Sequence, residues 1–232
     1  AAQLDEFMNF YKKFYIPNNA TLSIAGDIDV AATKELVEAY FGDIPAGTPV
    51  VQPTVEEPAL GGEKTLTVYD NIQLPAVMMG YRMPPQTSDD AYALQMASTV
   101  LSGGPSSRMY KRLVDQDQTA LQVFAFPFTL EQGGAFITFS LANAGKGIAD
   151  MTPALEEEIA KLQTELISER EFEKIQNQME SGFIQSNSTM AGIAESLADY
   201  HTYYGDANLI NTELARYQKV TREDIQRVAQ KY

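Results

Sequence analysis

Residues 120–141, ALQVFAFPFTLEQGGAFITFSL, decide the predicted fold. Two runs, Ala120 to Phe128 and Ala135 to Leu141, are rich in aromatic and β-branched residues, and Gly133-Gly134 lies between them. This pattern predicts a β-hairpin. The alternating run Lys64 to Tyr69 and the compact apolar run Ala76 to Tyr81 predict two further strands.

The sequence around and beyond this hairpin predicts helices. Ser88 can cap one helix, and a shorter helix is expected from about Ser106 to Val114. From Leu155 onward the apolar spacing is helical, with a capping box at 168–171 and Thr221 as the cap of the last helix. Strands grouped first and helices grouped later predict an α+β fold, in which an antiparallel sheet is covered by helices.

The N-terminal residues predict a helix, a strand and a second helix. The first helix covers Leu4 to Tyr15, the strand covers Thr21 to Ala25, and Asp29 caps the second helix, which runs to about Phe41. Four prolines and a pair of glycines between 45 and 62 predict an extended linker. The predicted organisation is therefore a helix-strand-helix unit at 1–45, a Pro-rich linker at 46–62 and a second domain at 63–232.

Composition excludes several function classes. The 232 residues carry a net charge of −14, which argues against nucleic acid or an anionic membrane as a partner. No apolar run is long enough to span a bilayer. The absence of cysteine excludes thiolate zinc sites and cysteine nucleophiles. These features leave the compartment open, and bacterial periplasm and cytoplasm are both compatible with them.

Four features of the sequence are candidate sites. Gly103 to Ser107 could cradle an anion at a helix start, but a flexible break between helices is the simpler interpretation. His201, the single histidine, is more simply a packed and hydrogen-bonded residue on an aromatic helix face. Glu156 to Glu158 is more simply a solvated N-terminal helix turn than a cation site. Ala120 to Phe128 could present a strand edge to an extended peptide or be an ordinary buried central strand.

Three stretches together resemble the M16 peptidases, which include pitrilysin and the mitochondrial processing peptidase. They are Phe14-Tyr15-Ile16-Pro17-Asn18-Asn19-Ala20-Thr21-Leu22 with Ala25-Gly26-Asp27, Tyr40-Phe41-Gly42-Asp43-Ile44-Pro45, and Leu101-Ser102-Gly103-Gly104-Pro105-Ser106-Ser107-Arg108-Met109-Tyr110. The first two resemble the end of the family's first half, and the third resembles the opening helices of its second half. The resemblance covers nearly the whole chain and implies a LuxS/MPP-like fold in which two similar halves enclose a chamber.

The resemblance also implies where chemistry should and should not lie. The family's catalytic zinc is held in the first half by an H-x-x-E-H motif, which is absent from this chain. No catalytic residue, metal ligand or cofactor is therefore expected here, and zinc is expected in the parent protein or a partner half. Active members place an Arg and a Tyr seven residues apart in the second half, where this chain has Val114 and Leu121. Neither side chain can donate a hydrogen bond to a peptide carbonyl.

Two functions remain open from the sequence. The first is a non-catalytic domain that helps form a peptide chamber and acts in hydrolysis only with an H-x-x-E-H half, in the same chain or a partner subunit. The second is a structural or assembly subunit without peptidase activity, which the departures at Val114 and Leu121 favour.

A weak internal repeat adds one structural expectation. The helix at 4–15 resembles the last helix, but only the first is followed by a strand within this sequence. The second domain is therefore predicted to lack its final strand. Thr21 to Ala25 is predicted to join the main sheet, within one chain or by exchange between two copies in a homodimer.

Overall fold

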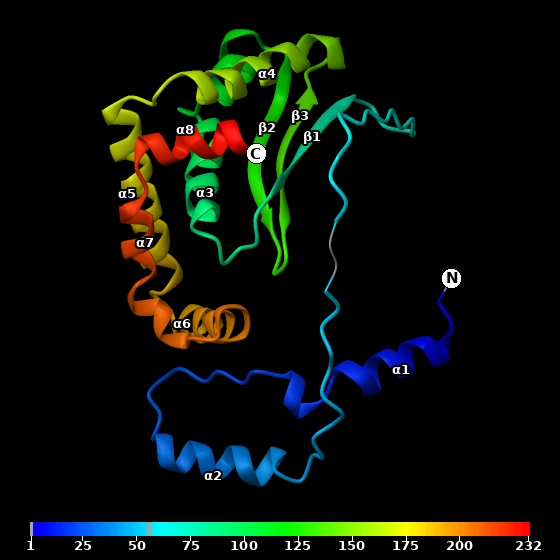
Figure 1. The fold of residues 1–232 in the computed structure, drawn as a ribbon, viewed down its shortest axis with the longest axis vertical. Helices are drawn as coiled ribbons and strands as arrows, with labels where there is room; N and C mark the ends of the chain where they lie inside the picture. The colour runs from blue at the N-terminus through cyan, green and yellow to red at the C-terminus, as the bar shows by residue number, and fades with distance from the viewer. Residues whose placement is uncertain (1, 55–56) are drawn as a thin grey trace. The chain divides into compact units, whose positions relative to one another are not determined.

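The computed structural model describes residues 2–54 and 57–232, shown in Figure 1. Val55 and Glu56, which belong to the predicted linker, lie outside the described residues, as does Ala1. The described residues group into two compact units, one formed by 1–59 with 184–210 and the other by 60–183 with 211–232. The linker and domain boundaries given above stay predictions.

The elements follow one another in a mixed order. They are α1 (Leu4–Phe14), η1 (Pro17–Asn19), α2 (Val30–Phe41), β1 (Ala76–Met83), α3 (Asp89–Ser102), η2 (Tyr110–Gln116), β2 (Ala120–Thr129), β3 (Gly134–Ala142), α4 (Ile148–Thr164), α5 (Glu169–Ser186), α6 (Met190–Asp199), η3 (Tyr200–Tyr204), η4 (Ala207–Asn211), α7 (Glu213–Lys219) and α8 (Arg222–Lys231). Within the described residues no helix is long and apolar enough to cross a membrane. The predicted α+β class is confirmed.

The sheet of the larger unit is antiparallel, with the order β1-β3-β2. The predicted hairpin is present, because β2 and β3 pair from Ala120 with Ala142 to Thr129 with Gly134. Strand β1 pairs with the other side of β3, from Ala76 with Leu141 to Met83 with Gly134. The central strand is therefore β3, and β2 and β1 lie at the two edges of the described sheet.

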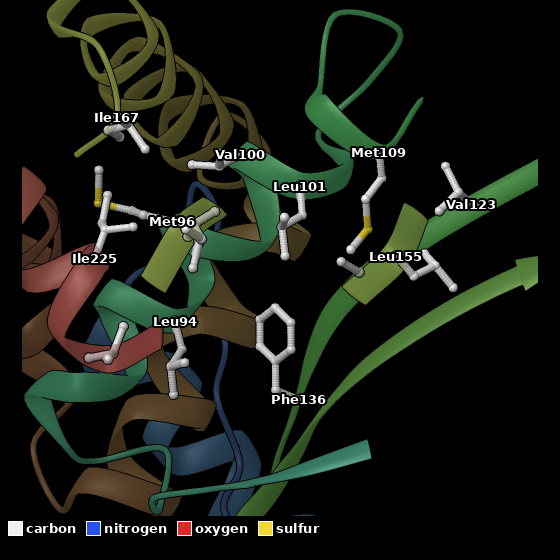
Figure 2. Close-up of a cluster of buried hydrophobic side chains, with 14 of the residues drawn as sticks. Leu94, Met96, Val100, Leu101, Met109, Val123, Phe136, Leu155, Ile167 and Ile225 are labelled. Atoms are coloured by element: carbon white, nitrogen blue, oxygen red, sulfur yellow. The ribbon is translucent and has the colours of Figure 1, made fainter. Parts of the chain in front are cut away.

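One face of the sheet is covered by helices and forms the core. Figure 1 shows α3, α4 and α8 beside the strands, and Figure 2 shows side chains gathered between them. The buried residues include Leu94, Met96, Val100, Leu101, Met109, Val123, Phe136, Leu155, Ile167 and Ile225. Since each large apolar side chain that is fully buried contributes about 1.5–3 kcal/mol relative to exposure, this cluster is the main stabilising feature of the larger unit.

Local capping explains where several helices begin. Ser88 Oγ accepts a hydrogen bond from the Asp90 amide at the start of α3, and Asp29 Oδ1 accepts one from the Ala32 amide at the start of α2. At α8, the amide of Asp224 donates to Thr221 Oγ1 while the amide of Thr221 donates to an Asp224 carboxylate oxygen. These side chains satisfy amides that the first helical turn leaves without partners, as the sequence predicted.

Two predicted strands are absent from the described residues. Thr21 to Ala25 and Lys64 to Tyr69 are both extended without any ladder, so neither is a strand of the described sheet, and the joining of Thr21 to Ala25 to the main sheet stays a prediction. Their apolar side chains are exposed, with Leu22 at 59% and Leu66 at 84%. Alternation predicts a strand only where a neighbouring strand supplies the hydrogen bonds, and here none is supplied.

Two hydrogen bonds in the smaller unit join residues that are distant in the sequence. Asn18 Nδ2 donates to the carbonyl of Gly47 at 2.7 Å, and Thr202 Oγ1 donates to Thr21 Oγ1 at 3.1 Å. Helix α1 confirms the predicted amphipathic helix, although no residue of α1 or α2 is buried in the described structure.

Candidate functional site

The first predicted substrate position, Val114, lies in the π-helical turn η2. The amide of Asp117 donates to the carbonyl of Arg112 at 2.9 Å, and the amide of Thr119 donates to that of Leu113, which closes the widened turn. Val114 is half-buried and packs against the core. Single π-helical turns occur frequently at functional sites, but the Val114 side chain offers only apolar contact.

The second predicted position, Leu121, lies at a β-bulge in β2. Ala120 pairs with Ala142 and Gln122 pairs with Leu141, so Leu121 has no residue opposite it on β3. Its side chain is 51% exposed. A bulge bends the strand and redirects a side chain, which is why bulges recur beside active sites. The sequence identified both positions only by resemblance, because neither the π-helical turn nor the bulge has a signal in the residues themselves.

These two positions are joined by a backbone segment that is itself unusual. Gln118, between η2 and β2, has φ of 51°, a left-handed conformation that few residues other than glycine adopt. Its carbonyl accepts a hydrogen bond from Asn143 Nδ2 at 3.2 Å, which fixes the segment to the end of β3. Val114 is half-buried, Leu121 is 51% exposed, and neither side chain carries a polar group. A substrate role for these two residues stays a prediction.

The face of the sheet opposite the helices is largely apolar on β2 and β3, and Arg82 of β1, which pairs with Ala135, lies on the same face. Strand β2 places Phe124, Phe126 and Phe128 there, with 48%, 42% and 53% of each residue exposed. Phe124 stacks on Phe139 of β3, with ring centroids 6.3 Å apart and planes at 24°. The residues of β2 and β3 that share this face are Gln122, Phe124, Phe126 and Phe128 with their partners Leu141, Phe139, Ile137 and Ala135, and none of them is charged.

We call this surface the open face. Three phenylalanines that are each about half exposed on one strand form a contiguous patch, which in soluble proteins marks a surface for interaction. The part of this surface that β2 and β3 form carries no charge and favours apolar side chains of a partner or ligand, because burying unpaired charges against it would be costly.

The edge of β2 is closed to further strands by α3. Ser102 Oγ accepts a hydrogen bond from the Ala125 amide at 2.7 Å and donates to the Ala125 carbonyl at 3.0 Å. Two residues further on, Pro127 has no amide proton to offer. The interpretation of β2 as a central strand is wrong, since β2 lies at the edge of the described sheet. Peptide addition is disfavoured at Ala125 and Pro127, because the backbone groups of Ala125 are bonded to Ser102 and Pro127 has no amide proton.

The loop at Gly103 to Ser107 separates α3 from the helical segment that contains η2, as expected, and it is hydrogen-bonded to α5. Lys174 Nζ of α5 donates to Ser106 Oγ at 2.5 Å, and Gln178 Nε2 donates to the Gly103 carbonyl at 3.3 Å. Arg108 forms two hydrogen bonds to Glu171, of 2.9 and 2.8 Å, and this pairing raises the pKa of Arg108. The Ser106 hydroxyl and the cation of Lys174 are thus already used in structural contacts.

The remaining polar candidates also have structural surroundings. His201 is exposed, and the buried aromatic of its turn is Tyr200, so the expected packed imidazole is wrong. Glu156 to Glu158 lies in the middle of α4, because this helix begins at Ile148 and continues through Pro153. Glu158 is buried and bonds Lys161 at 2.8 Å, so the expected solvated N-terminal turn is wrong as well.

Zinc does not fit the residues of this chain. Among residues 2–54 and 57–232 no group of three His, Cys, Asp or Glu side chains is arranged to hold a metal ion, and the sequence has one histidine and no cysteine. A catalytic zinc site commonly uses three protein ligands of this kind, with histidine prominent among them.

Comparison with known proteins agrees with this geometry. Residues 1–179 match the family model described as the peptidase M16 inactive domain. The chain belongs to this family. The zinc protease PqqE of Helicobacter pylori is 25% identical over 232 residues, which are 99% of this chain and 52% of that protein. This inactive domain thus spans about half the length of the relatives that it matches.

Two solved structures confirm the fold. The crystal structure of a protease from Helicobacter pylori superposes with a TM-score of 0.93 at 25% identity, covering 100% of this chain and 56% of that one. A peptidase M16 inactive domain from Pseudomonas fluorescens superposes with a TM-score of 0.79 at 14% identity, covering 100% of this chain and 54% of that one, which shows the shared fold alone. The M16 resemblance seen in the sequence is confirmed.

Proposed function

We propose that this M16 inactive domain forms one wall of a peptide chamber in a zinc endopeptidase, opposite a catalytic half that carries H-x-x-E-H. The catalytic half belongs to the same polypeptide or to a partner subunit. The observation that carries the proposal is the open face, the aromatic surface that β2 and β3 form on the side of the sheet away from the helices. Relatives named zinc proteases that are about twice as long support a second half.

In this proposal the domain contributes binding and positioning, while the catalytic half holds zinc and activates water. Phe124, Phe126 and Phe128 would contact apolar side chains of an extended peptide, and Leu121 at the bulge would extend this surface toward η2. Because Leu121 and Val114 cannot hydrogen-bond a peptide carbonyl through their side chains, orientation of the scissile bond falls to the catalytic half.

The test removes aromatic contacts from the open face of the complete peptidase. Phe124→Ala with Phe126→Ala should raise KM for an apolar peptide about 5- to 30-fold, the equivalent of roughly 1–2 kcal/mol of lost contact, while kcat changes little. Leu166→Ala is the matched control, because Leu166 is 42% exposed, as Phe126 is, but lies after α4 and outside the sheet. An unchanged KM in the double variant would refute a role for the open face in binding peptide.

A second function, assembly without peptidase activity, is favoured by the apolar residues at Val114 and Leu121. The sequence upstream in the parent gene separates the two. An H-x-x-E-H motif about 100 or more residues before Ala1 supports the peptidase, and its absence supports a scaffold that pairs with an active subunit.

A further inference from the structure

Strand β1 adds a row of residues beside the open face. Val77, Met79 and Tyr81 pack against the core, so the alternate residues of β1 lie on the other side of the sheet. Because partners in an antiparallel pair share one face, this row lies next to the β3 residues of the open face. The row consists of Ala76, Met78, Gly80 and Arg82, which pair with Leu141, Phe139, Ile137 and Ala135.

Gly80 leaves a gap in this row of side chains. A methyl group added at Gly80 would meet no atom within 4 Å, whereas Met78, two residues earlier, is 65% exposed. Across the sheet, Gly80 pairs with Ile137, and Ile137 pairs in turn with Phe126 of β2. We call this feature the Gly80 gap, which lies between Met78 and Arg82 on β1 and beside Ile137 on β3. Its surroundings are therefore apolar on all sides but that of Arg82.

The fold of β1 does not require a glycine at this position. Gly80 has no positive φ angle, and nothing packs against the place that a side chain would take. The register of β1 with β3 runs from Ala76 to Met83 without a shift, so Gly80 does not mark a bulge. Glycine weakens a strand, and inside a regular strand it often marks a place that a ligand or another backbone approaches closely. The gap is therefore explained best by an occupant.

Arg82 brings a positive charge to the edge of the gap. Among the residues that β1, β2 and β3 pair on this face of the described sheet, Arg82 is the charged one, and it is half-exposed. Arg82 also interacts within the chain, but a guanidinium has five N–H donors and can bind a carboxylate as well. The net charge of −14 is screened beyond about 8 Å at physiological ionic strength, so the contact with Arg82 determines which charge is accepted here.

We infer that the Gly80 gap holds a large apolar side chain of a bound peptide, and that Arg82 pairs with an acidic side chain two residues away on the same peptide. This inference rests on the proposed function, in which the open face binds peptide. Gly80 and Arg82 are alternate residues of one strand and are separated by about 6.6–6.8 Å along it. Alternate residues of an extended peptide have the same separation, so one peptide reaches both. The substrate class is thus a peptide with an apolar and an acidic residue at alternate positions.

Peptide binding to the parent protein tests the charge preference. Labelled peptides would carry one phenylalanine, with glutamate or lysine two residues before or after it. Their dissociation constants would be measured by fluorescence anisotropy at physiological ionic strength, with a zinc chelator present to prevent cleavage. The glutamate form should bind about 3- to 10-fold more tightly than the lysine form in at least one of the two placements.

Variants at Arg82 show whether this residue sets the preference. Arg82→Glu should reverse the preference, and Arg82→Lys should keep it. Arg170→Glu is the matched control, because it makes the same change of net charge at an exposed position of α5 and should leave the preference unchanged. Equal affinities for the glutamate and lysine peptides, or a preference that survives Arg82→Glu, would overturn the inference.

A variant at Gly80 tests the gap itself. Gly80→Val fills the gap and should weaken binding of the phenylalanine peptide about 5- to 20-fold. A peptide with alanine in place of phenylalanine should change less than about twofold, because it does not use the gap. The melting temperature of the variant should not fall, since valine has open space there and favours a strand. Equal losses for the two peptides would show that the gap does not hold the apolar side chain.

These measurements separate the inference from the proposed function. A glutamate preference that Arg82→Glu reverses, in a parent that hydrolyses no peptide without chelator, would support the inference and contradict the peptidase. Hydrolysis by a parent that binds glutamate and lysine peptides equally would support the peptidase and overturn the inference. Failure of the parent to bind any of the peptides would contradict both.

Discussion

Asp90 should be a major electrostatic determinant of stability in the larger unit. Its carboxylate accepts hydrogen bonds from Arg227 Nη1 at 2.8 Å, from Lys231 Nζ at 2.8 Å and from the Tyr232 hydroxyl at 2.9 Å. The carboxylate lies in the first turn of α3 and its side chain is 13% exposed. The Asp90 carboxylate therefore links the last turns of α8 and the following Tyr232 to the start of α3.

The size of this contribution follows from the pKa of Asp90. Burial alone would raise it, but the hydrogen bonds from Lys231, Arg227 and Tyr232 lower the pKa from 3.8 to about 2. A fall of that size corresponds to about 2 kcal/mol of stabilisation when the group is ionised. Because Arg227 and Lys231 are about half exposed and screened by water and salt, we expect Asp90→Asn to cost about 1–2 kcal/mol at pH 7.

The pH dependence gives this prediction its sign. A depressed pKa in the folded state contributes stability that is complete above the unfolded value near 4 and is lost as the pH falls through about 2. Urea unfolding followed by circular dichroism should therefore show a deficit for Asp90→Asn that is full at pH 7 and nearly gone at pH 1.5. Asp115→Asn, at an exposed position, is the control and should stay within about 0.5 kcal/mol of the unmodified chain. An equal deficit at both pH values would refute the electrostatic explanation.

Three further predictions concern the sheet and the predicted substrate positions. Ser102→Ala should cost about 1–3 kcal/mol in urea unfolding and speed exchange of the Ala125 amide, because the cap of the β2 edge is lost; unchanged exchange would mean that another group serves that amide. Thr138→Val should leave the melting temperature of the chain unchanged or raise it, since Thr138 Oγ1 is buried without a hydrogen-bond partner in the described structure. A clearly lower melting temperature would reveal a partner such as water. Val114→Arg with Leu121→Tyr should produce no peptide hydrolysis in this chain alone, because oxyanion stabilisation acts only beside an activated water, and turnover that chelators abolish would show that the active site is misplaced.

The sequence was most informative where structure is local. The hairpin around Gly133-Gly134, the caps at Ser88 and Thr221 and the amphipathic helix at 4–15 depend on residues within a few positions of one another, and all are confirmed. Membership of the M16 family could be predicted for a similar reason, because the motifs of the family are short runs that occur in a fixed order along the chain.

Features that depend on distant partners could not be predicted. The strands expected at Thr21 to Ala25 and Lys64 to Tyr69 are absent from the described structure, because a strand needs a neighbour that the periodicity of one segment cannot reveal. The cap of Ala125 by Ser102 joins residues 23 positions apart, and a serine at the end of a helix has many ordinary explanations.

The candidate site was predicted only in part. The composition of Ala120 to Phe128 predicted a strand, but the bulge at Leu121 determines which residues share the open face, and no residue type marks a bulge in advance. The start of α4 was placed near Glu156, whereas the helix begins at Ile148 and accommodates Pro153 within its early turns.

Reconstitution tests the central claim most directly. The H-x-x-E-H half of the parent protein and this inactive domain would be produced separately, mixed, and assayed for hydrolysis of an apolar peptide with and without a zinc chelator. Each half alone should be inactive, or nearly so, and the mixture should show activity that the chelator abolishes. Hydrolysis by this chain alone, or full activity of the other half without it, would contradict the account.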